Sequence, residues 1–134
     1  MSSHEHGGGA RPDAGTQLDE SRRQRGYELE MHRIMATADP EWFGKYAAFI
    51  EATYTGPRLL DRKTKELLQI VVEAAVRADV DQIRAHVRVA LREGATPREI
   101  LEALEAVIAP MGALAFRRGV QAWAAETGFE EGRP

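Results

Sequence analysis

The chain has 134 residues, of which 43% are hydrophobic and 29% charged, and its formal net charge is -3 at pH 7. This length fits one hydrophobic core, its apolar runs fall short of the roughly 20 residues of a membrane span, and an acidic chain lacks the basic surface that nucleic acid requires. Cysteine is absent, which excludes disulfides, thiolate metal sites and thiol catalysis. We therefore expect a soluble protein that binds neither nucleic acid nor membrane.

The first segment, residues 1–21, is rich in Gly, Ser, His and Asp and has little to bury. Ordering such a segment costs conformational entropy without compensation. The sequence therefore predicts a disordered tail over 1–21 and a single helical domain over 22–134. The tail lacks the apolar stretch of a secretory signal, so we expect a cytoplasmic protein. His4 and His6 have no further ligands nearby, and we expect no metal site.

The rest of the pattern predicts a compact all-α bundle of about six helices. The first helix runs from about Tyr27 to Met35, where apolar residues recur at helical spacing. The second begins with Asp39 as N-cap and Pro40 in the first turn, and ends at Gly56-Pro57. Apolar side chains at helical spacing on this second helix are expected in the core: Trp42, Tyr46, Phe49, Ile50 and Tyr54.

Asp61 is placed to cap a third helix, which is apolar over most of its circumference and therefore expected to be central. The apolar residues of this helix are Leu67, Leu68, Ile70, Val71, Val72, Ala74, Ala75 and Val76. A fourth helix follows the turn at 78–81 and ends at Glu93-Gly94. The residues that it is expected to bury are Ile83, Val87, Ala90 and Leu91.

Thr96 and Glu99 form a capping box that starts a fifth helix, which Pro110 and Gly112 disturb. Its expected buried residues are Ile100, Leu101, Leu104, Val107, Ile108 and Met111. The sixth helix ends at Gly128, and its apolar residues are Phe116, Val120 and Trp123.

A polar stripe follows one face of the third helix at steps of four, three, four and four residues: Arg62, Glu66, Gln69, Glu73 and Arg77. One interpretation is a solvated edge with ion pairs of Arg62 with Glu66 and of Glu73 with Arg77. The other is a functional face.

Two histidines lie on predicted helices. His86 falls at the margin of the fourth helix's buried face, where a half-buried imidazole suits proton transfer. A hydrogen-bonded packing role is the alternative for His86. His32 falls away from the apolar stripe of its own helix.

The stretch from Leu60 to Trp123 resembles the conserved core of carboxymuconolactone decarboxylases and their alkylhydroperoxidase D-like relatives. The matching pieces are the opening LDRKTKEL, a helix, the segment AHVRVALREGATPREILE with its histidine, glycine and capping box, and the small-residue turn MGALAF. The resemblance implies that Glu66 and His86 approach one another from neighbouring helices.

In the peroxidase branch of this family, those two positions activate a CxxC pair. The corresponding positions here are Asp79 and Gln82, and neither side chain can be oxidised as a thiol. Thiol peroxidase activity is therefore excluded.

The decarboxylase branch implies removal of carbon dioxide from a small, cyclic, anionic substrate, an unsaturated lactone acid, without metal or organic cofactor. Such a reaction needs a general acid for the carbon that loses the carboxylate, and donors that hold carboxylate oxygens. The resemblance implies His86 as the acid or base and Glu66 as its orienting carboxylate. The substrate-binding candidates are Arg62, Gln82 and Arg117.

The alternative is a non-catalytic helical binding or assembly module that kept the family fold. The long N-terminal tail and two departures from the family pattern favour it. One extra residue stands between Glu66 and His86, near Ala78-Asp79, and Gly112-Ala113-Leu114 replaces a frequent Gly-x-Pro. Because family members assemble, the resemblance also implies a homo-oligomer, either a trimer or a hexamer.

Overall fold

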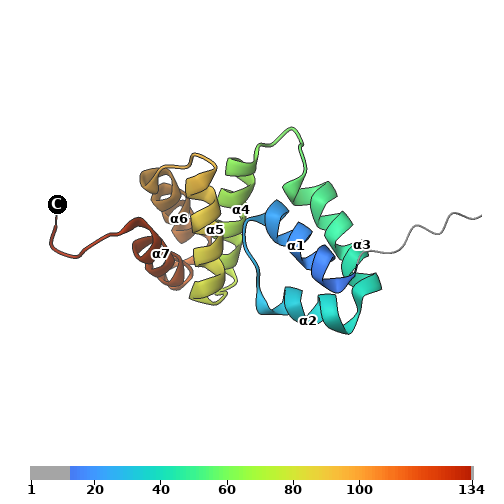
Figure 1. Ribbon diagram of the computed structural model, residues 1–134. Coiled ribbons are helices and arrows are strands. Elements are labelled where there is room, and N and C mark those ends of the chain that lie inside the picture. The colour runs from blue at the N-terminus through green and yellow to red at the C-terminus, as the bar shows by residue number, and fades with distance from the viewer. Residues whose placement is uncertain (1–12, 134) are drawn as a thin grey trace, which may run out of the picture. The chain divides into compact units, whose positions relative to one another are not determined.

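The computed structural model describes residues 13–133, and these residues hold helices and no strand (Figure 1). The predicted all-α class is confirmed. The described residues divide into two compact units, with the boundary between Phe49 and Ile50, where the sequence predicted one domain from residue 22 onward. Among residues 13–133, none of the helices combines the length and hydrophobicity that crossing a bilayer requires.

The first unit contains α1 (Ala14–Arg25), α2 (Glu30–Ala38) and most of α3 (Pro40–Ile50). The Asp13 carboxylate starts α1 by accepting a hydrogen bond from the Thr16 amide at 2.7 Å. Gly26 ends this helix in the left-handed conformation, with φ 83°. The predicted disorder is therefore wrong for residues 14–21, because a capped helix forms there although it buries few apolar side chains. Residues 1–12, with the histidine pair, lie outside the described residues.

The buried face of α2 differs from the predicted one. Met31 and Ile34 are exposed, whereas His32 and Ala36 are buried. The side chain of His32 decides this orientation, because its Nε2 lies 2.9 Å from Nη1 of the buried Arg25 on α1. The stabilisation from a buried polar contact between two helices therefore outweighs the cost of exposing two apolar side chains.

Helix α3 begins as predicted, with the Asp39 carboxylate accepting a hydrogen bond from the Trp42 amide at 3.0 Å. Its aromatic residues are only partly in the core. Phe43 is fully buried, whereas Trp42 and Phe49 are exposed. The predicted burial of Trp42 and Phe49 is wrong, because the core face of the helix runs through Phe43 instead.

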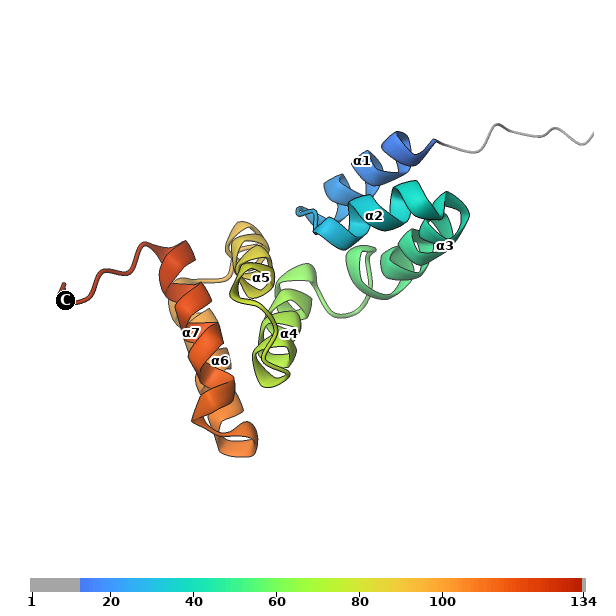
Figure 2. The ribbon, with the colours of Figure 1, turned by 90° about the horizontal axis from the view of Figure 1, so that it is seen from below.

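The second unit contains a π-helical turn, η1 (Glu51–Thr55), and four α-helices. These are α4 (Arg62–Ala75), α5 (Val80–Arg92), α6 (Pro97–Met111) and α7 (Ala113–Thr127). Helix α4 packs against the other three, and α6 and α7 lie side by side (Figures 1 and 2). The predicted central position of α4 is confirmed.

The predicted caps of this unit are also confirmed. The Asp61 carboxylate accepts a hydrogen bond from the Thr64 amide at 2.8 Å. Thr96 and Glu99 form the reciprocal capping box, with distances of 3.1 and 3.2 Å. Gly128 ends α7 in the left-handed conformation.

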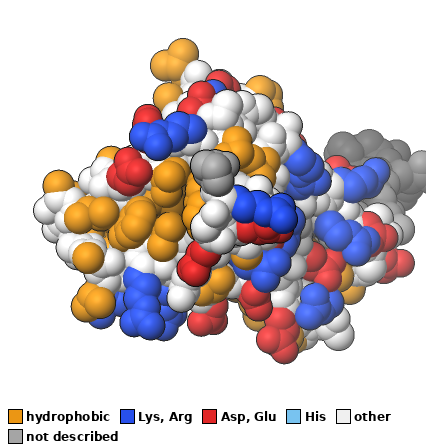
Figure 3. Space-filling view, turned by 90° about the vertical axis from the view of Figure 1, so that its left-hand side faces the viewer, with side chains coloured by type: hydrophobic (Ala, Val, Ile, Leu, Met, Phe, Trp, Pro, Cys, Tyr) orange, Lys and Arg blue, Asp and Glu red, His pale blue; other side chains and the backbone are white. Residues whose placement is uncertain are grey.

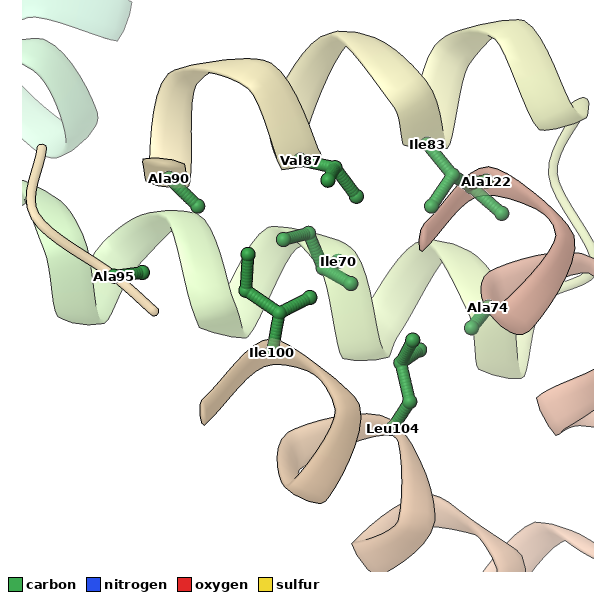
Figure 4. Close-up of a cluster of buried hydrophobic side chains, with 9 residues drawn as sticks. All are labelled: Ile70, Ala74, Ile83, Val87, Ala90, Ala95, Ile100, Leu104 and Ala122. Atoms are coloured by element: carbon green, nitrogen blue, oxygen red, sulfur yellow. The ribbon is translucent and has the colours of Figure 1, made fainter. Parts of the chain in front are cut away.

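The hydrophobic core of this unit lies between its four helices. Figure 4 shows Ile70 of α4 facing Ile100 and Leu104 of α6, with Ile83 and Val87 of α5 on the other side. Small side chains complete the cluster and let the helices approach: Ala74, Ala90, Ala95 and Ala122.

Several apolar side chains lie on other faces than predicted. Leu68 and Val72 on α4 and Val76 at its C-terminal cap are exposed, although the sequence predicted a central helix that is apolar over most of its circumference. On α6, the predicted burial of Ile108 and Met111 is wrong, because both are exposed.

Helix α7 buries its smallest residues, Ala115, Gly119 and Ala122. Its larger residues Phe116, Val120 and Trp123 are only half-buried. The reason is a close approach between helices. A Cβ at Gly119 would lie 2.4 Å from Cδ2 of Leu104 and 3.3 Å from Cβ of Ala74.

Candidate functional site

A buried polar cluster lies between α4 and α5. Glu66 and Glu73 stand seven residues apart on α4, which places them two turns apart on one face. His86 of α5 lies between their carboxylates. Its Nδ1 is 2.8 Å from Oε2 of Glu66, and its Nε2 is 3.1 Å from Oε1 of Glu73. Both ring nitrogens therefore face a carboxylate.

The Glu66 carboxylate is fully buried and receives further hydrogen bonds. The Arg62 guanidinium, one turn earlier on α4, donates from Nε to Oε1 of Glu66 at 2.6 Å. The Tyr54 hydroxyl donates to the same oxygen. The Arg62 guanidinium also lies over the Tyr54 ring, 4.6 Å from its centroid. Glu66 thus joins α4, α5 and η1 at one point.

The π-helical turn η1 carries Tyr54 into this cluster. The buried Lys65 ammonium holds the turn in place by donating to the carbonyls of Tyr54 and Gly56, each at 3.1 Å. Single π-helical turns occur often at functional sites, because the extra residue per turn redirects a side chain.

The Glu73 carboxylate has fewer hydrogen-bond donors around it than the Glu66 carboxylate. The Gln82 amide donates from Nε2 to Oε1 of Glu73 at 2.9 Å. The other carboxylate oxygen, Oε2, is buried and accepts no hydrogen bond from the described residues. A buried carboxylate oxygen without a donor is unfavourable. This oxygen is therefore the place in the cluster where a further donor would be stabilised.

Electrostatics keep His86 protonated. Burial alone would lower the pKa of His86, but hydrogen bonds to Glu66 and Glu73 and the charges of both carboxylates raise the pKa to about 9. Burial alone would raise the pKa of Glu66, and hydrogen bonds from His86, Tyr54 and Arg62 hold that pKa below its usual value. Two carboxylates and two cations therefore balance one another at neutral pH.

We expect the free energy of unfolding to fall as the pH rises from about 6.5 to 9. The folded pKa of His86, about 9, lies above the ordinary value of 6.5. Its stabilising contribution is therefore fully present below pH 6.5 and lost as the pH rises through 9. Urea unfolding at stepwise pH measures the decline. The variant His86→Gln should flatten it, and an equally steep decline in that variant would contradict the assignment.

His32 titrates in the opposite direction and in a different range. Burial, with a smaller effect from Arg25, lowers the pKa of His32 to about 4. The contribution of His32 to stability is consequently lost as the pH falls from 6.5 toward 4. The decline in stability above pH 6.5 can therefore be attributed to His86 and not to His32.

The structure brings four of the five predicted site residues together: Glu66, His86, Arg62 and Gln82. Arg117 is placed elsewhere, on the exposed surface of α7, where it lines a hollow with Arg77 and Arg118. The extra residue near Ala78-Asp79 does not separate Glu66 from His86, because the connection between α4 and α5 accommodates it.

The polar stripe of α4 is not a solvated edge. Its predicted pair of Arg62 and Glu66 forms, but within the buried cluster. The predicted pair of Glu73 and Arg77 is wrong. Helix α4 ends at Ala75 and Arg77 has a left-handed φ of 58°, so Arg77 leaves the helical path and Glu73 pairs with His86 and Gln82 instead.

Sequence reasoning missed two members of the cluster. For Glu73 the sequence left a solvated edge and a functional face as open alternatives, although its spacing of two turns from Glu66 on the stripe could have indicated a second carboxylate for His86. Tyr54 was assigned to the core, and the π-helical turn that carries it has no sequence signal. Within residues 13–133, no group of three or more His, Asp or Glu side chains has the arrangement of a metal site.

Comparison with known proteins places the chain in a family. The model of the carboxymuconolactone decarboxylase family matches residues 40–125. A crystal structure of a proposed carboxymuconolactone decarboxylase from Burkholderia xenovorans LB400 has a TM-score of 0.70 and 22% sequence identity. The alignment covers 84% of this chain and 92% of that one, which shows a shared fold. No match was found among curated proteins. Because the family match spans more than half of the sequence, the chain belongs to the carboxymuconolactone decarboxylase family.

Proposed function

We propose that the protein is a cofactor-independent lyase that decarboxylates a small, cyclic, anionic substrate of the unsaturated lactone acid type. The family supports the reaction class. The observation that carries the proposal is the His86 ring held between two carboxylates in a buried site. The thiol peroxidase branch is excluded because the chain has no cysteine.

In such a decarboxylation, the bond from carbon to the carboxylate breaks and carbon dioxide leaves. The electron pair is taken up by the unsaturated lactone, and the product forms when a proton is added to carbon. His86 supplies this proton, since its pKa of about 9 keeps the imidazolium charged at neutral pH. Glu66 holds Nδ1 at 2.8 Å and orients the ring. The proton leaves from Nε2, whose contact with Glu73 is longer, at 3.1 Å.

The substrate carboxylate needs cationic or amide donors beside His86. Arg62 is the cation of the cluster whose side chain retains some exposure, 15%. Gln82 is half-buried and donates to Glu73. We assign Gln82 to the entrance, because its half-buried amide shares Oε1 of Glu73 with Nε2 of His86. Arg62 and Gln82 then hold the substrate carboxylate from two sides.

A non-catalytic binding module is the second candidate. The observation that favours it is the enclosure of His86, which is 2% exposed and has both ring nitrogens engaged by carboxylates. In this case the cluster serves to join α4, α5 and η1, and no substrate reaches the ring.

Decarboxylation of carboxymuconolactone by the purified chain separates the two candidates. The lyase should release one carbon dioxide for each substrate consumed, measured together with the change in ultraviolet absorbance. The assay is run with and without a chelator, because the proposed mechanism requires no metal. A folded protein that releases no carbon dioxide above the uncatalysed rate would favour the binding module.

We also propose that the protein is a homo-oligomer, a trimer or a hexamer. Leu68 and Val72 on α4 and Val76 directly after it form an exposed apolar row. Figure 3, which views the molecule from the side of α6 and α7, shows further hydrophobic side chains that gather between charged ones. Burying such surface between copies is favourable. Light scattering at micromolar concentration should give a mass of three or six chains, and Val72→Lys should reduce that mass. A mass of one chain for the unmodified protein would contradict the proposal.

A further inference from the structure

A hollow of about 260 Å³ opens at the surface of the second unit, apart from the His86 cluster. Its lining comes from the turn after α4 and from the first turns of α7: Arg77, Leu114, Arg117, Arg118 and Gln121. Three of these five side chains are arginines, although the whole chain carries a net charge of -3. Concentrating like charges around a concave surface creates a local positive potential, which attracts anions.

The three guanidinium groups differ in their partners. Arg118 is fixed, because its Nη1 donates to the carbonyls of Arg77 and Ala78 at 2.8 and 3.3 Å. It also lies 3.9 Å from the Asp79 carboxylate. The side chains of Arg77 and Arg117, in contrast, form no ion pair or hydrogen bond with residues 13–133. Two guanidinium groups at this hollow thus retain their donors for a ligand.

The backbone of Arg77 is strained. Its φ of 58° lies in the left-handed region, where glycine is favoured at the end of a helix and other residues are destabilised. The hydrogen bonds from Arg118 to two successive carbonyls hold this turn. An arginine at a backbone position that favours glycine indicates that the guanidinium of Arg77 has a functional role.

We propose that this hollow is a second binding site, for a small organic anion that carries carboxylate or phosphate groups. Arg77 and Arg117 pair with the acidic oxygens, since a guanidinium presents two parallel donors to either group. Gln121 supplies an amide, and Leu114 supplies an apolar wall for the carbon skeleton. The volume suits a ligand of metabolite size, below that of typical drug-binding pockets.

Titration calorimetry with succinate and with inorganic phosphate tests the proposal at low ionic strength. Saturable binding of either probe is expected, and the better probe identifies the acidic group. The variant Arg117→Gln should weaken the binding of that probe at least tenfold. Arg98→Gln is the matched control, because Arg98 is exposed and pairs with Glu102 at 2.8 Å outside the hollow. Binding that is unchanged in Arg117→Gln, or absent with both probes, would overturn the proposal.

Arg77→Gly provides a second variant that is expected to fold. It removes a guanidinium and relieves the left-handed strain, so it should weaken anion binding while raising the free energy of unfolding. Turnover at the His86 site should be unchanged in both variants, which separates this site from the proposed lyase. A change of oligomer mass in Arg117→Gln, without anion binding by the unmodified protein, would identify the hollow as an interface between copies and overturn the proposal.

Discussion

Replacing His86 with glutamine should lower the turnover of the proposed decarboxylation by roughly a hundredfold or more, the usual contribution of general acid catalysis. Glutamine has a similar bulk and offers one amide donor, but it cannot carry the proton that the substrate carbon requires. It also leaves Glu66 and Glu73 without the positive charge that now lies 2.8 and 3.1 Å from them. Steady-state kinetics at pH 7 measure the loss as a fall in kcat.

His32→Gln is the matched control for this variant. His32 is the other buried histidine among residues 13–133, and it contacts Arg25 in the first unit. Its replacement should reduce stability and leave turnover unchanged. If His86→Gln keeps its turnover within a few-fold and only loses stability, His86 is a packing residue, and the non-catalytic candidate becomes the better one.

A substitution at Glu73 gives a second test of the role of His86 as the general acid. Glu73→Gln keeps the size of the side chain and removes one of the two carboxylates that raise the pKa of His86. The alkaline limb of the pH–rate profile, which reports deprotonation of the acid, should move to lower pH. An unshifted limb would show that Nε2 of His86 does not deliver the proton beside Glu73.

Local signals made much of the secondary structure predictable. Asp61 and the pair of Thr96 and Glu99 act within three residues of sequence, so their caps follow from the order of residues alone. Asp13 carries the same kind of signal. It was missed because the surrounding composition indicated disorder and α1 buries mainly the polar residues Ser21 and Arg25.

The cluster was predictable in part. Glu66 and His86 lie twenty residues apart, and only the family resemblance indicated that they meet. Glu73 belongs to the same helical face as Glu66, but helical spacing alone does not distinguish a solvated face from one that another helix covers. Tyr54 depends on a local π-helical turn held by Lys65, an arrangement that apolar periodicity does not reveal.

The buried face of α7 was not predictable from hydrophobicity, because the distance between helices decides it. The large apolar residues of this helix, Phe116, Val120 and Trp123, are only half-buried. The structure buries Gly119 with two alanines instead, since α7 approaches α4 and α6 closely at that residue. This close approach predicts a large effect from a small substitution.

Gly119→Val should lower the free energy of unfolding by about 3 kcal/mol, at the upper end for overpacking of a core. The first added carbon alone would lie 2.4 Å from Cδ2 of the fully buried Leu104. Gly44→Val is the control, because a Cβ at that helical glycine meets no atom nearer than 3.6 Å. Urea unfolding, followed by circular dichroism, measures both variants.

A double-mutant cycle identifies the contact responsible. Leu104→Ala alone should cost about 2–5 kcal/mol, because it leaves a cavity in the core. In the double variant, the valine at residue 119 occupies part of that cavity, so the combined loss should be smaller than the sum of the two single losses. Additive losses would show that residue 119 does not press on Leu104, and that helix spacing does not determine which face of α7 is buried.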